Sequence, residues 1–122
     1  MKNAIILSLL ALSFTACKKE KYEGYQSFWF DAMTSHNLDE MADVSTLTLY
    51  IDEEFVSTVD VNDYKLSVPA CKEGQFLYTD KMYKKETAKH QFKIVDQTNQ
   101  VFWHGNFTTE AGACNITINL GF

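Results

Sequence analysis

Three cysteines and three histidines are the side chains of this chain best suited to covalent, redox or metal chemistry. They are Cys17, Cys71, Cys114, His36, His90 and His104. The histidines form no His-x-His or His-x-x-x-His pair, the spacing that brings two imidazoles to one metal ion. No Gly-x-Ser-x-Gly, phosphate-loop or His-Glu-x-x-His motif occurs. We therefore predict no metal, no cofactor and no catalytic residue.

Cys17 is the cysteine whose surroundings are most informative. It follows a short positively charged start and an unbroken apolar run over residues 4–14, and charged residues begin directly after it. A run of this length fits a secretory signal and is too short to span a bilayer. Thr15-Ala16-Cys17 resembles the bacterial lipobox, where a peptidase cleaves ahead of a diacylglyceryl-modified cysteine. The alternative is an ordinary signal peptide followed by a chance cysteine.

The lipobox resemblance implies a domain organisation and a location. Residues 1–16 are the expected signal peptide, and residues 17–24 are the acylated Cys17, carrying chains such as palmitate, with a polar tether. Two or three acyl chains hold a protein stably on a bilayer. Lys18 is not the aspartate that retains lipoproteins at the inner membrane, so the resemblance implies the bacterial outer membrane. Periplasmic and cell-surface orientations both stay open.

The remaining cysteines, Cys71 and Cys114, are predicted to form a disulfide. Lipidation of Cys17 removes the odd cysteine from the count, and an exported protein meets oxidising conditions. The alternative is a catalytic Cys71 with His90 or His104 as its base. No motif of a thiol enzyme surrounds Cys71, so the disulfide is the preferred interpretation.

Two acidic segments contain side chains that could do chemistry of their own. Residues 52–54 (Asp-Glu-Glu) hold neighbouring carboxylates of the kind that act in acid–base catalysis. Residues 60–63 (Asp-Val-Asn-Asp) offer oxygen ligands but lack the glycine and distal glutamate of a calcium loop. Both segments are interpreted as hydrated turns.

Aromatic side chains form a candidate binding patch. Phe28, Trp29 and Phe30 are adjacent, and Trp103 lies in a second aromatic segment. Neighbouring side chains of a strand point to opposite faces, so some of them would reach the surface and contact a glycan or a protein. The alternative, which we prefer, is that they fill the core of a small domain.

Alternating apolar and polar residues identify the elements that position these side chains. They predict about seven short strands, at residues 25–30, 46–51, 55–59, 75–78, 89–94, 101–107 and 114–120. Residues 34–44 are the one segment expected to hold a helical turn. Residues 25–122 are thus predicted to form an all-β domain, an antiparallel β-sandwich with a small β-barrel as the alternative.

Composition excludes some partners. The chain has 122 residues, a net charge of -5, and lysine as its only strongly basic residue type. The acidic balance and the absence of arginine argue against nucleic-acid binding, which relies on basic surfaces and guanidinium contacts.

Five motifs occur in order along the chain: Phe28-Trp29, the strand 47–52, Pro69-Ala70-Cys71, Trp103-His104-Gly105 and a last strand that starts at Cys114. Together they resemble small lipoproteins of the Bacteroidota, for which no activity is established. The resemblance implies a lipid anchor and a β-sandwich with a cysteine pair. It departs at residues 52–54, where a glycine is usual.

The function predicted from the sequence is a membrane-anchored envelope lipoprotein without enzymatic activity. It would contact the lipid bilayer through the acylated Cys17 and serve as a binding or structural module for a protein or glycan. The first alternative is an inhibitor or immunity-type lipoprotein whose acidic surface suits a basic target. The second is a small envelope hydrolase.

Overall fold

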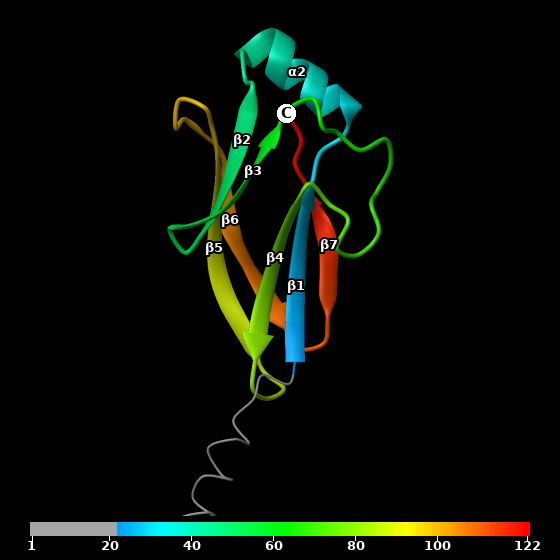
Figure 1. The fold of residues 1–122 in the computed structure, drawn as a ribbon, viewed down its shortest axis with the longest axis vertical. Coiled ribbons are helices and arrows are strands. Elements are labelled where there is room, and N and C mark those ends of the chain that lie inside the picture. Colours follow the sequence, from blue (N-terminus) through cyan, green and yellow to red (C-terminus); the bar gives the residue numbers. More distant parts are fainter. Residues whose placement is uncertain (1–21) are drawn as a thin grey trace, which may run out of the picture.

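The computed structural model describes residues 22–122, which form two β-sheets and one α-helix (Figure 1). The elements in chain order are β1 (Tyr22–Trp29), α2 (Ala32–Ala42), β2 (Thr46–Ile51), β3 (Glu54–Asp60), β4 (Phe76–Met82), β5 (Thr87–Asp96), β6 (Val101–Glu110) and β7 (Cys114–Asn119). The predicted signal peptide and Cys17 lie outside the described residues. Within residues 22–122, no helix combines the length and apolar character needed to cross a membrane.

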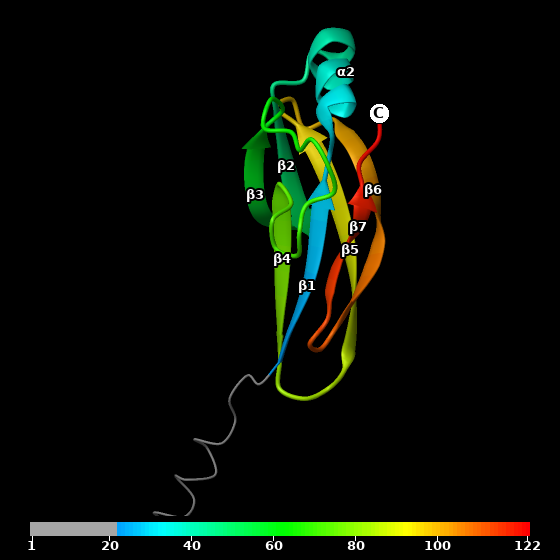
Figure 2. The ribbon, with the colours of Figure 1, turned by 90° about the vertical axis from the view of Figure 1, so that its right-hand side faces the viewer.

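The strands form a sandwich of two sheets (Figure 2). One sheet has the strand order β4-β1-β7, and the other has the order β3-β2-β5-β6. The pairings are antiparallel except that β1 runs parallel to β7. This confirms the predicted all-β sandwich rather than its closed alternative, and a strand is present at each of the predicted segments.

The first strand begins earlier than predicted, inside the segment 17–24 that the sequence predicts as a tether. Tyr22 pairs with Met82 and Gly24 with Asp80 across β1 and β4. Gly24 lies against the backbone of Glu110, where an added Cβ atom would be 2.8 Å from the carbonyl oxygen. Glycine therefore allows two strands to approach closely here and does not act as a flexible spacer.

The core lies between the sheets. Leu47, Leu49 and Ile51 of β2 point inward and are buried, as their alternation predicts. Phe28 of β1 meets Phe92 of β5 with ring centroids 4.9 Å apart. Burial of a large apolar side chain stabilises a fold by roughly 1.5–3 kcal/mol, so these contacts hold the two sheets together.

Helix α2 stands at the end of the sandwich opposite the start of β1 (Figures 1 and 2). Its N-cap is Asp31, whose carboxylate accepts a hydrogen bond from the Thr34 N–H at 2.9 Å. Asp43 closes the helix in the left-handed conformation, and Leu38 is fully buried. The two caps and this buried contact explain why a segment predicted to hold one turn forms an 11-residue helix.

Candidate functional site

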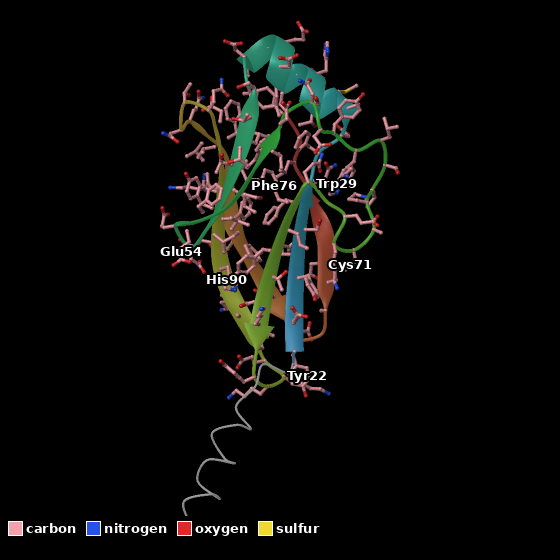
Figure 3. The ribbon with its side chains drawn as sticks, viewed as in Figure 1. Tyr22, Trp29, Glu54, Cys71, Phe76 and His90 are labelled. Atoms are coloured by element: carbon pink, nitrogen blue, oxygen red, sulfur yellow. A yellow bond between two sulfur atoms is a disulfide. The ribbon has the colours of Figure 1, made fainter. Side chains whose placement is uncertain are left out.

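Cys71 and Cys114 form the predicted disulfide. Their Cα atoms are 6.1 Å apart and the bond closes a sequence separation of 43 residues. Cys71 belongs to the connection between β3 and β4, and Cys114 opens β7 at one edge of the three-stranded sheet (Figure 3). Since both sulfur atoms are used in the bond, Cys71 does not provide the thiol that the catalytic alternative needs.

The candidate aromatic patch does not lie on the surface. Phe28 and Phe30 are fully buried and Trp29 is 7% exposed. Trp103 is half-buried against the core, and its indole N–H donates to the Gly121 carbonyl oxygen at 3.0 Å. Phe28, Trp29 and Phe30 therefore pack in the core and do not form a surface patch, whereas Trp103 is only partly covered.

Adjacent residues of β1 are buried because both faces of this strand are covered. The four-stranded sheet covers the inner face. The outer face is covered by the connection of residues 61–75, which we call the covering segment. Its Gln75 side chain accepts a hydrogen bond from the Phe30 N–H and donates one to the Phe30 carbonyl oxygen, at 3.2 and 2.9 Å. Gly74 lies so close to β1 that a Cβ atom would collide with the Ser27 hydroxyl oxygen. The disulfide fastens this segment to β7.

A histidine held between two carboxylates lies at the other edge of the three-stranded sheet (His90 in Figure 3). The Nδ1 atom of His90, on β5, is 2.6 Å from Asp52 Oδ2, and its Nε2 atom is 2.6 Å from Asp80 Oδ2. The Thr109 hydroxyl on β6 also donates to Asp80 Oδ2, at 2.6 Å. We call these four residues the histidine clasp. Because Asp80 is on β4 and the others belong to the four-stranded side, the clasp ties the two sheets together.

The turn between β2 and β3 positions Asp52 in the clasp. Asp52 and Glu53 both have positive φ, 50° and 69°, as a two-residue hairpin turn requires. The Asp52 N–H donates to the Gln91 carbonyl oxygen at 2.8 Å, and the Asp52 carboxylate accepts from the Gln91 N–H at 2.9 Å. The hydrated turn predicted for residues 52–54 is therefore present, and one of its carboxylates is held against β5.

The clasp holds His90 as a cation. Ionised carboxylates only accept hydrogen bonds, so both ring nitrogens must donate. The side chain of His90 is 11% exposed, and this burial opposes its charge. The bonds to Asp52 and Asp80 outweigh burial and raise the pKa of His90 above its ordinary value of 6.5. The bond from His90, followed by that from the Gln91 N–H, lowers the pKa of Asp52.

This arrangement is suited to joining the sheets rather than to transferring protons. A general base needs a free lone pair on its nitrogen, whereas both nitrogens of His90 are engaged. The Thr109 hydroxyl donates to Asp80, and Thr109 is fully buried, so this hydroxyl does not face a substrate at the surface. An open hollow of about 610 Å³ beside the clasp is lined by Lys89, Asn106 and other residues. The hollow thus offers polar contacts next to a histidine that is already fully bonded.

A second open hollow, of about 490 Å³, lies on the outer face of the four-stranded sheet, with Tyr50, Gln91 and Asn106 in its lining. Lys93 Nζ is 2.9 Å from Glu53 Oε2 and 5.3 Å from the centroid of the Tyr50 ring. Within residues 22–122, the side-chain amides of Gln91 and Asn106 have no hydrogen-bond partner. Unpaired amides beside an aromatic ring are groups that a polar partner can engage.

Charged side chains are divided unevenly between the two ends of the sandwich. The helix end comprises α2 with the residues beside it and carries Asp31, Asp39, Glu40, Asp43, Asp60, Asp63 and Lys65. The tether end comprises the start of β1, the β4–β5 connection and the β6–β7 turn, and it carries Glu23, Asp80, Lys81, Lys84, Lys85, Glu86, Lys89 and Glu110. The helix end is acidic, whereas four lysines balance four acids at the tether end, where Asp80 is also paired with His90.

The other histidines take no part in the clasp. His36 lies on α2 and His104 on the outer side of β6. Among the residues that the structure describes, no group of three or more His, Cys, Asp or Glu side chains is arranged to hold a metal ion. The Asp60 carboxylate accepts from the Asn62 N–H at 2.8 Å, an arrangement typical of a turn.

Asp80 is the residue of the clasp that the sequence analysis missed. Every second residue of β4, from Phe76 through Tyr78 and Asp80 to Met82, shares one face of the strand. A carboxylate on an otherwise apolar face requires a partner, and this pattern was the available signal. His90 itself is largely buried and is paired across strands.

Comparison with known proteins adds nothing to this geometry. No family model matches the chain, and no curated protein or solved structure is similar to it.

Proposed function

We propose that this chain is a lipoprotein anchored to a bacterial outer membrane through an acylated Cys17. Its β-sandwich then serves as a non-enzymatic binding or structural module. One observation carries the proposal: the first strand starts at one end of the sandwich, and α2 lies at the opposite end (Figure 1). A short tether before Tyr22 would therefore hold one end at the bilayer and direct the other end away from it.

The helix end is the surface that this orientation would present to a partner. Met33 and Met41 on α2 are 73% and 77% exposed, and Leu66 is 88% exposed. Lys65 forms a β-bridge with Asp31, which places Leu66 next to the start of α2. Exposed apolar side chains inside an acidic rim fit a protein partner, because apolar contacts supply affinity and charges supply specificity.

The clasp supports a binding or structural role over an enzymatic one. His90 is the one histidine held next to carboxylates in the described part of the chain, and its two nitrogens are fully used. A hydrolase would need the same ring with a free nitrogen beside a substrate. The outer-face hollow with its unpaired amides offers a second surface, which suits a glycan or a polar protein segment.

An inhibitor or immunity-type lipoprotein is the second candidate function, and the acidic helix end is the observation that favours it. A basic enzyme approaching this end would be steered by charge, and its association rate would fall as salt is added. Salt-independent binding by a basic target would remove the reason for this candidate.

Membrane fractionation of cells that express the native chain or Cys17→Ala tests the proposed function. We expect the native protein in the outer-membrane fraction and the variant in the soluble fraction. A variant that stays in the membrane fraction would contradict the lipid anchor. Protease treatment of intact cells then distinguishes periplasmic from surface orientation, and affinity capture with Met33→Asp/Met41→Asp as the matched control identifies partners that bind the helix end.

A further inference from the structure

The β4–β5 connection forms a basic tip beside the point where the chain enters the fold. Tyr22, the first residue of β1, pairs with Met82, the last residue of β4, and Tyr83 follows directly. Tyr83 is 59% exposed, and Lys84 and Lys85 are exposed beside it. We call residues 83–85 the lysine tip. Figures 1 and 2 show this connection at the end of the sandwich where β1 begins.

The length of the tether limits how far this tip can lie from a bilayer that holds Cys17. Five peptide units separate Cys17 from Tyr22, and five extended residues span at most roughly 17 Å. Charges act over a screening length of about 8 Å at physiological ionic strength. A chain of this length that is less than fully extended therefore brings the lysine tip within electrostatic range of the headgroups.

The charge of this end has the sign needed to approach anionic lipids. The tether and the tether end together carry seven lysines, namely Lys18, Lys19, Lys21, Lys81, Lys84, Lys85 and Lys89, against the four glutamates Glu20, Glu23, Glu86 and Glu110. Asp80, also at this end, is paired with His90. The helix end carries six acids against one lysine, and it would be repelled from the same surface.

We propose that the lysine tip docks on the anionic headgroups of the membrane that carries the anchor and so holds the sandwich upright, with α2 farthest from the bilayer. This inference rests on the proposed lipid anchor. Lysine ammonium groups are attracted to anionic headgroups, and the amphipathic ring of Tyr83 is suited to the interface between water and lipid. The anchor alone would leave the domain free to tilt, whereas anchor and tip together give two points of contact.

Hydrogen exchange of the acylated protein reconstituted into vesicles tests the docking. One set of vesicles contains phosphatidylcholine alone, and the other also contains phosphatidylglycerol. We expect the backbone amides of residues 83–86 to exchange several-fold more slowly on the anionic vesicles, and the β5–β6 turn, residues 97–100, to exchange equally on both. Two lysines near an anionic surface change the ratio of docked to undocked molecules by roughly thirty-fold.

A charge-matched pair of variants identifies the lysines responsible. Lys84→Glu/Lys85→Glu is expected to remove the difference between the two vesicle types, and Lys65→Glu/Lys72→Glu, with the same change in net charge, is expected to retain it. Added salt should abolish the protection in the native protein, which provides a test that needs no variant.

Two failures are distinguishable. Equal exchange of residues 83–86 on both vesicle types would overturn the docking while leaving the anchor intact. A native protein that is absent from the membrane fraction would overturn the proposed function, and this inference with it.

Discussion

The two edges of the three-stranded sheet are fastened by different chemistry. At the β7 edge, the Cys71–Cys114 disulfide holds the covering segment over β1. At the β4 edge, the histidine clasp joins Asp80 to the other sheet. A covalent bond holds at any pH and is lost on reduction, whereas an ion-paired histidine depends on its protonation. One domain thus combines a fastening that responds to redox conditions with one that responds to pH.

Of the two fastenings, removal of the disulfide is expected to reduce the stability of the fold most. Closing a loop of 43 residues contributes about 4 kcal/mol in the chain-entropy model. Cys71→Ala/Cys114→Ala should therefore lower the free energy of unfolding, measured in urea by tryptophan fluorescence, by up to that amount. Reduction of the native protein should reproduce the loss. A change of less than about 1 kcal/mol would show that the covering segment holds its place without the bond.

His90→Ala is expected to lower the free energy of unfolding by about 2 kcal/mol. The reason is that Asp80, only 18% exposed, would lose the cation that it is paired with. Asp52 is 49% exposed, so the loss of stability is smaller than that caused by breaking a fully buried ion pair. The matched control is His104→Ala, since His104 has no partner among residues 22–122 and its loss should leave stability unchanged. Equal effects of the two variants would contradict a fastening role for the clasp.

The pH dependence of stability separates the two fastenings. The raised pKa of His90 means that the clasp stabilises the fold fully below the ordinary value of 6.5 and loses this contribution as pH rises through the raised pKa. The lowered pKa of Asp52 means that its contribution is lost as pH falls through that lowered value. Unfolding in urea across a pH series should show a decline at higher pH in the native protein and none in His90→Ala. If stability declined equally in the native protein and in His90→Ala, a group other than His90 would be responsible for the pH dependence.

Glu53→Gly is expected to have the smallest effect and to act in the opposite direction. Glu53 has a φ of 69°, a conformation that glycine adopts without strain. The substitution should stabilise the fold by about 0.5–1 kcal/mol, less the exposed ion pair with Lys93. Glu53→Gln is the control that removes the charge and keeps the strain. A glycine variant no more stable than the glutamine variant would show that the turn is unstrained.

The sequence predicted the regular parts of this fold and missed the contacts between them. The alternation of Leu47, Leu49 and Ile51 identified β2 at its observed bounds, because a strand with one buried face records its environment in its own pattern. The covering of β1 and Phe30 by residues 61–75 involves a segment that is distant in sequence and irregular in structure. The clasp likewise required knowing that β4 and β5 belong to different sheets, and period-two patterns contain no information on sheet membership.

The parallel pairing of β1 with β7 has a consequence for how the domain comes into being. The first strand of the described chain pairs with the last one, and the disulfide cannot form before Cys114 is available. Contacts between such distant segments form late, because the intervening chain must first be available to close the loop. A chain that is synthesised or threaded through a pore from its N-terminus therefore cannot complete this domain until β7 has emerged. For the exported, lipid-anchored chain that we propose, this strand order would favour export in an unfolded form, and tethering of the N-terminus would precede completion of the fold.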